Sequence, residues 1–347
     1  MTKCKIALFA PDISHRGRGL HRYQLGFIEA LNKINLKHYY FDIYVRRDAS
    51  DLLKINNKNI NIIEIDFYNN LYWLLIQYPI ILLKNNYDVI HSLNDSPILF
   101  MLFKGKLIIT LIESVKERRF EFVKQVKMIR YFIFRILEYS TLKRANIIIC
   151  ISKYNRIKLL SKYPQYKKKV LMEYPGLSSS FKNSKFYNKE RQQNENYTLI
   201  MISGLRDYKI EYIDYLVKNS YVKCVGCVNR DMKINYPTID FNCNISDYDL
   251  SMLYKNASIY VHLSFIEGLG YSILESLVQR TKVLAPNSTA IKELLPKHYL
   301  YSSYNEFKLK FNKIVEMNKD DYFSRINIKN FKWKMQNYIK LYDQFHN

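Results

Sequence analysis

The stretch from Ile259 to Val278 constrains the fold of this chain more than any other segment. It opens with the apolar, β-branched run Ile259–Leu263, which is typical of a buried parallel strand, and it ends with the helical pattern Ile273–Val278. Gly268 and Gly270, two of only nine glycines in the chain, lie in the loop between them. Glycine lets backbone N–H groups approach a ligand closely, and a helix N-terminus favours a phosphate group. The stretch therefore predicts a strand–loop–helix unit that binds a phosphorylated ligand.

Two glutamates flank these glycines at a spacing of eight residues. Glu267 precedes the helix, and Glu275 lies a little more than one turn inside it. Carboxylates accept hydrogen bonds from hydroxyl groups. One carboxylate can therefore bind hydroxyls near a reacting group while the other reaches a ribose. An acidic loop followed by a capped helix is the structural alternative for this pattern.

The string from Glu267 to Ser276 resembles the E-x7-E signature of retaining GT-B glycosyltransferases of the GT4 type. The family consensus runs roughly E-G-F-G-L-P-x-x-E-A, and this chain keeps both glutamates and both glycines. Four positions differ, with Leu269 for Phe, Tyr271 for Leu, Ser272 for Pro and Ser276 for Ala. The resemblance extends over nearly the whole chain and is strongest from 246 to 295.

The resemblance implies an α/β fold of the GT-B type, with two Rossmann-like doubly wound domains facing a cleft. A length of 347 residues is long for one domain and comfortable for two. We expect an N-terminal acceptor-side domain at 1–182, a polar linker at 183–196 and a nucleotide-sugar-binding domain at 197–329. Residues 330–347 are expected to form a helix that packs back on the N-terminal domain.

Apolar segments alternate with helical patterns along the chain, as is typical of doubly wound sheets. In the first half, strands are expected at 5–10, 40–45, 60–65, 88–92, 107–112 and 147–151. In the second half, strands are expected at 198–202, 222–226, 240–245, 259–263 and 283–285. Ligands of such sheets bind at the carboxyl ends of the strands, so the loops that follow the strands are where binding residues are expected.

Two further loops resemble donor-binding loops of the family. The string Gly19-Leu20-His21-Arg22-Tyr23 resembles a G-I-G-R-Y-like string after the first strand, and Gly19 would let that loop approach the phosphates. Arg206 and Lys209 follow strand 198–202 and match the two cations that neutralise the donor diphosphate. Two solvated loop cations are the alternative for this pair.

The resemblance implies a retaining, metal-independent hexosyltransferase that uses a nucleotide diphosphate sugar as co-substrate and needs no cofactor. Glu267 would be the catalytic residue and would orient the hydroxyls of the donor sugar. Glu275 would hold the ribose. The expected donor-binding residues are Gly19, Arg206, Lys209, Gly268, Leu269, Gly270, Tyr271, Ser272 and Glu275.

One departure from the family follows strand 107–112. Many members carry a His-Asp pair there, and that His contacts the donor sugar, whereas this chain has Ile112 and Glu113. His91 and His21 are nearby in the predicted topology, although a lone His is more often structural. The departure motivates an alternative hypothesis, a non-catalytic GT-B scaffold associated with the membrane.

The chain is strongly basic, with 54 Lys and Arg against 31 Asp and Glu and a formal net charge of +23. Segment 115–144 combines nine Lys and Arg and three Glu with several aromatic residues. Such a basic amphipathic segment can lie on an anionic membrane, although a surface helix that packs on its own domain is the alternative. No nucleic-acid-binding motif accompanies it. The expected partners are a nucleotide sugar, a glycan or lipid-linked acceptor and an anionic membrane surface, and no nucleic acid.

Asp247-Tyr248-Asp249 spells a D-x-D motif that can hold a divalent metal beside a diphosphate. It also lies just before a helical pattern, and an N-cap with an acidic first turn is the interpretation we favour. No metal site is therefore predicted.

Localisation is predicted from the N-terminus, the hydropathy and the cysteines. The sequence enters its first strand directly, without a signal peptide, and no run reaches about 18 apolar residues. The five cysteines, including the pair Cys224-x-x-Cys227, are expected as free thiols of a reducing cytosol. We expect a cytoplasmic protein, peripheral at the inner face of the plasma membrane. Family habit points to bacterial surface polysaccharide biosynthesis (O-antigen, capsule or similar).

Overall fold

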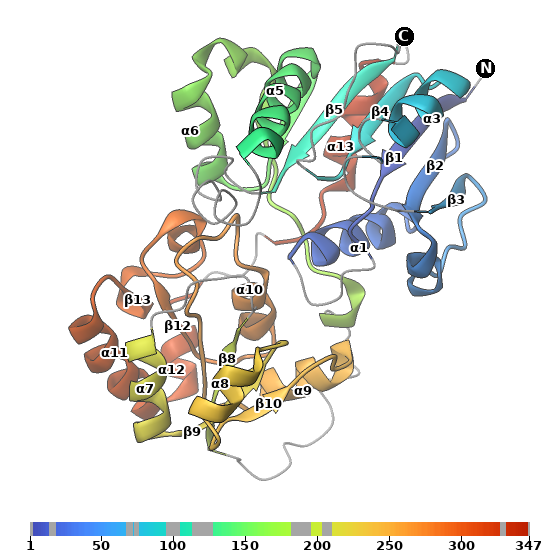
Figure 1. Cartoon of the computed structure of the whole chain (residues 1–347). Helices are drawn as coiled ribbons and strands as arrows, with labels where there is room; N and C mark the ends of the chain where they lie inside the picture. The colour runs from blue at the N-terminus through green and yellow to red at the C-terminus, as the bar shows by residue number, and fades with distance from the viewer. Residues whose placement is uncertain are drawn as a thin grey trace. The chain divides into compact units, whose positions relative to one another are not determined.

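The computed structural model describes residues 3–13, 19–66, 72, 76–94, 105–112, 128–181, 196–202, 210–326 and 331–345. The chain divides into two compact units. The first comprises Met1–Ser178 together with Lys332–Asn347, and the second comprises Ser179–Phe331. Each unit is built around its own parallel sheet (Figure 1).

The first unit contains a parallel sheet with the strand order β3-β2-β1-β4-β5-β6-β7. The chain runs outward from β1 to β3 and then resumes at β4 on the other side of β1, so the sheet is doubly wound. Its strands are β1 (Cys4–Phe9), β2 (Tyr39–Arg46), β3 (Ile60–Ile65), β4 (Val89–Ser92), β5 (Lys106–Leu111), β6 (Ile147–Cys150) and β7 (Val170–Met172).

Helices cover both faces of this sheet. One face buries an apolar cluster that includes residues of α3, α5 and α6, and the other packs on α1 and α13. The helices are α1 (Gly19–Leu31), α3 (Tyr78–Lys84), α5 (Met128–Arg144), α6 (Lys153–Lys162) and α13 (Met335–Asp343), with 3-10 helices η1 (Arg47–Leu52) and η3 (Pro164–Lys169).

The C-terminal helix α13 is held on the N-terminal sheet by buried polar and aromatic contacts. Nδ1 of His91 lies 2.7 Å from the Tyr342 hydroxyl, and Nε2 lies 3.0 Å from Oγ1 of Thr110. Complete burial lowers the pKa of His91 to about 3, so the ring is neutral. Just before the helix, Trp333 packs closely on Gly176. A Cβ atom added at position 176 would lie 2.4 Å from the backbone nitrogen of Trp333.

The second unit contains a parallel sheet with the order β10-β9-β8-β11-β12-β13, which is again doubly wound. Its strands are β8 (Tyr197–Met201), β9 (Tyr221–Val225), β10 (Asp240–Asn242), β11 (Ile259–Val261), β12 (Val283–Pro286) and β13 (Leu300–Tyr301). The helices are α7 (Ile210–Asn219), α8 (Arg230–Asn235), α9 (Asp247–Asn256), α10 (Tyr271–Val278), α11 (Tyr304–Glu316) and α12 (Lys319–Phe323), with 3-10 helices η4 (Ser179–Phe181), η6 (Thr289–Glu293) and η7 (Lys297–Tyr299). The predicted fold class, α/β with two Rossmann-like doubly wound sheets, is confirmed.

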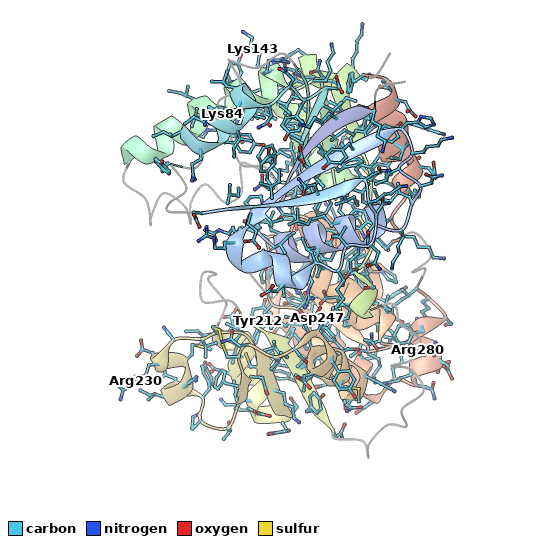
Figure 2. The ribbon with its side chains drawn as sticks, turned by 90° about the vertical axis from the view of Figure 1, so that its right-hand side faces the viewer. Lys84, Lys143, Tyr212, Arg230, Asp247 and Arg280 are labelled. Atoms are coloured by element: carbon cyan, nitrogen blue, oxygen red, sulfur yellow. A yellow bond between two sulfur atoms is a disulfide. The ribbon has the colours of Figure 1, made fainter. Side chains whose placement is uncertain are left out.

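Two cations fix the segment that leads from α10 to β12. Arg280 has φ +56°, a left-handed conformation that usually favours glycine after a helix. Its guanidinium, labelled in Figure 2, bonds Asp320 at 2.7 Å and lies over the ring of Phe323. Lys282 is buried, and its Nζ donates to the carbonyls of Val315 and Met317 at the end of α11. Both cations therefore serve packing within this unit.

Only the second half of the basic segment 115–144 falls on described residues. It forms α5, in which Leu137 is buried while Ile136 and Tyr139 are 67% and 47% exposed. The first half, 115–127, lies outside the described residues. Within the described ranges, no helix is long and apolar enough to cross a membrane.

Candidate functional site

The loop 262–270 follows β11 at the point where the strand order of the second sheet reverses. The chain runs from β8 outward to β10 and returns to β11 on the opposite side of β8. In open α/β sheets, ligands bind outside the carboxyl ends of the strands at such a reversal. The predicted strand–loop–helix unit therefore occupies the position in this unit at which a ligand is expected.

Gly270 gives α10 its sharp start. Its φ of +99° is a conformation that L side chains rarely adopt, and an added Cβ would lie 3.2 Å from Cδ1 of Ile273. The carbonyl of Gly270 accepts the N–H groups of Ile273 and Leu274. The helix begins at Tyr271, so the N-terminal end of its dipole lies directly after the glycine loop. This arrangement suits an anion.

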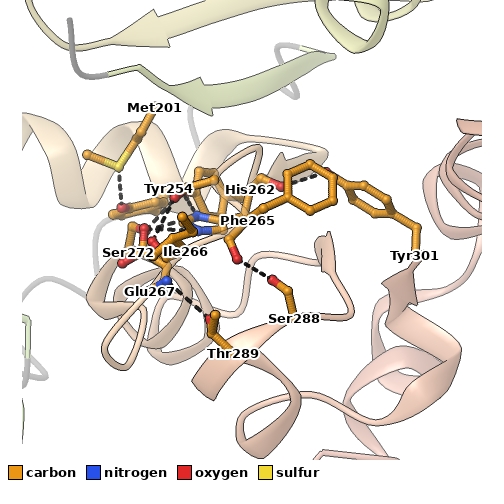
Figure 3. A network of polar contacts seen from close by, with 12 residues as sticks. Met201, Tyr254, His262, Phe265, Ile266, Glu267, Ser272, Ser288, Thr289 and Tyr301 are labelled. Atoms are coloured by element: carbon orange, nitrogen blue, oxygen red, sulfur yellow. Dashed lines mark hydrogen bonds and ion pairs between the residues drawn. The ribbon is translucent and has the colours of Figure 1, made fainter. Parts of the chain in front are cut away.

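The loop that carries Glu267 is fixed by short polar contacts, within the loop and from the residues at the start of η6 (Figure 3). The backbone N–H of Glu267 donates to Oγ1 of Thr289 at 3.1 Å. The hydroxyl of Ser288 donates to the carbonyl of Phe265 at 2.6 Å, and that of Ser264 donates to the carbonyl of Ile266 at 3.1 Å. Because the backbone from Phe265 to Glu267 is anchored by these contacts, Glu267 is presented on a preformed backbone.

The side chain of Glu267 faces a histidine that the sequence analysis did not single out. Its Oε1 lies 3.4 Å from Nε2 of His262, and the two side chains are 14% and 6% exposed. The Nδ1 atom of His262 lies 2.9 Å from the hydroxyl of Tyr260 and 3.4 Å from that of Ser272. Residues 260 and 262 share one face because strand side chains alternate. The sequence signal that could have identified these contacts is a Tyr and a His two residues apart in an apolar strand.

Glu275 is buried inside the unit, with 2% of its surface exposed. The hydroxyl of Tyr254, from α9, lies 3.3 Å from its Oε2 and 3.0 Å from Sδ of Met201 at the end of β8. Glu275 is thus placed beside the end of β8, at the reversal of strand order. A buried carboxylate needs hydrogen-bond donors, and Tyr254 supplies one of them.

The structure brings most of the predicted donor-binding residues together. The segment from the end of β11 to the middle of α10 carries Glu267, the run 268–272 and Glu275. Leu269 in this segment is buried. Arg206 and Lys209, which connect β8 with α7 in the sequence, lie outside the described residues. Gly19 belongs to the first unit, where it is the exposed first residue of α1.

Residue 112, where many members of the resembled GT4 family carry a His, is a buried aliphatic side chain. Ile112 is 4% exposed, and its carbonyl accepts from the side-chain amide of Asn155 at 3.1 Å. Glu113 lies outside the described residues. His91 is committed to the contacts with α13, and His21 is buried with its Nδ1 against the carbonyl of Ile13. Both histidines are structural.

The D-x-D motif begins α9 with the expected cap (Asp247 is labelled in Figure 2). The hydroxyl of Ser246 accepts the N–H of Asp249 at 3.1 Å and donates to its carboxylate at 2.6 Å. Among the residues described, no group of three or more His, Cys, Asp or Glu side chains is arranged to hold a metal ion.

The expectation of five free thiols is wrong for two cysteines. Cys227 and Cys243, just after β9 and β10, form a disulfide with a Cα–Cα distance of 5.2 Å. Cys4, Cys150 and Cys224 are buried free thiols. Burial raises the pKa of the Cys224 thiol to about 12, so this residue is a packing group.

The chain is similar to known proteins in its structure rather than in its sequence. No protein-family model matches the sequence, and no curated protein matches it significantly. Among solved structures, a sucrose-phosphate synthase from Thermosynechococcus elongatus is similar at a TM-score of 0.71 and 16% identity, covering 99% of both chains. Anabaena HepE in complex with UDP-glucose is similar at 0.67 and 14%, covering 98% of this chain and 99% of HepE. A glycosyltransferase from Rickettsia africae is similar at 0.65 and 15%, covering 99% of both. The two doubly wound units and these similarities together show that the chain has the GT-B fold.

Proposed function

We propose that this protein is a retaining glycosyltransferase that moves a hexose from a nucleotide diphosphate sugar to a glycan or lipid-linked acceptor. One observation carries the proposal: Glu267 and Glu275 flank a left-handed glycine and a helix N-terminus where the strand order reverses. This arrangement combines an anion site with two hydroxyl acceptors. A nucleotide diphosphate sugar presents a diphosphate and hydroxyls on both sides of it.

In the proposed reaction, the protein stabilises a departing diphosphate and an oxocarbenium-like sugar. The N-terminus of α10, from Gly270 to Ser272, takes phosphate charge together with Arg206 and Lys209. No metal is needed for this role. Glu267 orients hydroxyls of the donor sugar, and Glu275 holds the ribose. The leaving phosphate helps to deprotonate the acceptor.

The remaining donor-binding assignments are part of the same proposal. Gly268, Leu269 and Tyr271 shape the loop beside the phosphates, and Gly19 is assigned to donor binding in the same proposal. The similarity to Anabaena HepE, which binds UDP-glucose, supports a nucleotide sugar as co-substrate.

The cellular setting is proposed from the resemblance to the GT4 family and from the charge. The excess of 54 Lys and Arg over 31 Asp and Glu favours an anionic partner. We place the protein in the cytoplasm, peripheral at the inner face of the plasma membrane through segment 115–144. The pathway is bacterial surface polysaccharide biosynthesis.

A thermal-shift screen against UDP, GDP and ADP sugars, with and without EDTA, tests the proposal. Binding to the native state raises the unfolding temperature, because ligand that binds only the folded protein stabilises it. We expect one nucleotide class to raise it, with the shift unchanged by EDTA. A shift that EDTA abolishes would contradict metal independence.

A non-catalytic scaffold is the second candidate function, and one observation favours it. Ile112 fills the place of a donor-contacting His with a buried aliphatic side chain. A scaffold would bind no nucleotide sugar, so an absence of thermal shift with all three classes favours it. Binding together with turnover excludes it.

A further inference from the structure

We propose that His262 is a positioning residue for Glu267, and that it couples this carboxylate to the N-terminus of α10. The inference rests on the proposed function of Glu267. It adds a role for a side chain outside the E-x7-E string. His262 touches neither the phosphates nor the sugar in this proposal, and it acts through Glu267.

The burial of the pair is the first reason. Nε2 of His262 lies 3.4 Å from Oε1 of Glu267, and no hydrogen-bond partner meets this nitrogen within the described part of the chain. A buried polar nitrogen without a hydrogen bond is costly. Hydrogen bonds of catalytic groups are often long before substrate binds and tighten in the complex. Oε1 of Glu267 is the acceptor that a small rotation of either side chain would bring into hydrogen-bond geometry with Nε2.

The surroundings of both ring nitrogens bear on which of them carries the hydrogen. Nδ1 of His262 lies 2.9 Å from the Tyr260 hydroxyl and 3.4 Å from the Ser272 hydroxyl, and those hydroxyls lie 2.9 Å apart. A hydroxyl both donates and accepts, so Nδ1 finds a hydrogen-bond partner in either tautomer. A carboxylate only accepts, so Nε2 can bond Glu267 only when it carries a hydrogen. We therefore assign a hydrogen to Nε2, on the side of the carboxylate.

The ring is also held in place from its backbone. The N–H of His262 donates to the carbonyl of Leu284 in the neighbouring strand at 2.9 Å. Its carbonyl accepts from the buried hydroxyl of Tyr301 at 3.1 Å. The backbone of His262 is therefore fixed, and with Nδ1 beside two hydroxyls the ring is placed to orient Glu267 (Figure 3).

The network connects two parts of the proposed donor site. Ser272 is the second residue of α10, where the diphosphate would lie, and Glu267 would contact the sugar. Tyr260 and His262 join the two through side chains of a single strand face. Binding of the phosphates beside Ser272 would thus be communicated to the carboxylate that contacts the sugar. A positioning role predicts an effect on turnover more than on nucleotide affinity.

Two substitutions of His262 separate positioning from packing. Gln places a side-chain amide near the position of Nε2, whereas Phe keeps the ring volume and removes both nitrogens. With UDP-glucose as the probe, His262→Phe should lower kcat by about ten- to hundredfold with KM changed little, and His262→Gln should restore kcat to within about threefold of the wild type. The exposed residue His298 provides the matched control, and His298→Phe should leave kcat unchanged. Equal kcat for the wild type and His262→Phe would overturn the proposal, as would equal losses for the Phe and Gln variants.

A second measurement does not depend on turnover. Nitrogen-15 NMR of the histidine rings in the ligand-free protein reports the tautomer, and the His262 signal is assigned by its loss in His262→Gln. We expect the hydrogen on Nε2, with a signal that moves in Glu267→Gln. A hydrogen on Nδ1, or a signal indifferent to Glu267→Gln, would overturn the inference. If the wild type turns over no nucleotide sugar, the proposed function fails. The NMR result still shows whether Nε2 of His262 donates to Glu267.

Discussion

The hydroxyl of Tyr254 lies 3.3 Å from Oε2 of Glu275, and the two residues reach each other from α9 and α10. We expect Glu275→Ala to weaken nucleotide binding by about ten- to hundredfold, because a hydrogen bond to a charged group contributes about 1.5–3 kcal/mol. Calorimetric titration with the nucleotide found in the screen measures the effect. Unchanged affinity would refute the ribose role.

Tyr254→Phe should weaken nucleotide binding less than Glu275→Ala does. It removes one donor to the carboxylate and leaves the carboxylate itself in place. Tyr322→Phe is the matched control, because the Tyr322 hydroxyl bonds the backbone of Val283 and no donor-binding residue. The same titration compares the three variants. Equal losses in Tyr254→Phe and Tyr322→Phe would mean that the contact with Glu275 has no part in binding.

Glu267→Ala should lower turnover by about 10²–10³-fold with little loss of nucleotide affinity, since its proposed contact is with the sugar near the reacting carbon. Its carboxylate lies in the loop anchored by Thr289 and Ser288, so the loop backbone should survive the change. Steady-state kinetics and nucleotide titration on the same preparation separate the two effects. Normal turnover would contradict the assignment.

Gly270→Ala should destabilise the second unit by about 1–2 kcal/mol, because an L side chain at φ +99° is strained. Nucleotide affinity should fall with it, because the start of α10 shifts. Chemical denaturation of the wild type and of Gly270→Ala compares the free energies of unfolding. A Gly270→Ala variant as stable as the wild type would argue against the left-handed start.

The disulfide between Cys227 and Cys243 closes a loop with a sequence separation of 16 residues. Chain-entropy arguments give a stabilisation of about 3 kcal/mol for such a loop. Dithiothreitol should therefore lower the unfolding temperature of the wild type and leave that of the double Cys227→Ser, Cys243→Ser variant unchanged. Equal responses of the two proteins would show that the bridge does not form in solution.

Buried neutral His91 predicts a loss of stability in acid. Its folded pKa of about 3 lies below the ordinary value of 6.5, so the unfolded state binds more protons between these limits. The contribution of this group is present above pH 6.5 and is lost as pH falls toward 3, by at most about 1.4 kcal/mol per pH unit. His91→Asn should flatten the pH dependence of unfolding between pH 6.5 and 5, whereas substitution of exposed His298 by Asn should not. Identical slopes would contradict the assignment.

Local patterns were sufficient to predict doubly wound α/β sheets and the loop between Glu267 and Glu275, whereas the GT-B arrangement was implied by the family resemblance. Gly270 and the flanking strand and helix are read from neighbouring residues, and this part of the prediction needed no tertiary information. The short strands β7 and β13 were not predicted. They have three and two residues and lie at sheet edges, where little burial pattern develops.

Residues that meet only through the sheet could not be predicted in the same way. Cys227 and Cys243 come together because β9 and β10 pair in a register that sets Val225 beside Asn242. That register is absent from the sequence pattern, and a disulfide cannot be assigned without it. The polar roles of Tyr260 and His262 were not predicted, because both residues lie in an apolar run and their polar atoms are a small part of large side chains.

Proton NMR of UDP-glucose incubated with the wild type and with Glu267→Gln tests the central claim most directly. The same experiment can be repeated with whichever donor gives a thermal shift. The account predicts that the wild type releases nucleoside diphosphate and that the transferred or hydrolysed sugar first appears in the anomeric configuration of the donor, while Glu267→Gln releases far less. Inversion at the anomeric carbon, or equal release by the two proteins, would contradict it.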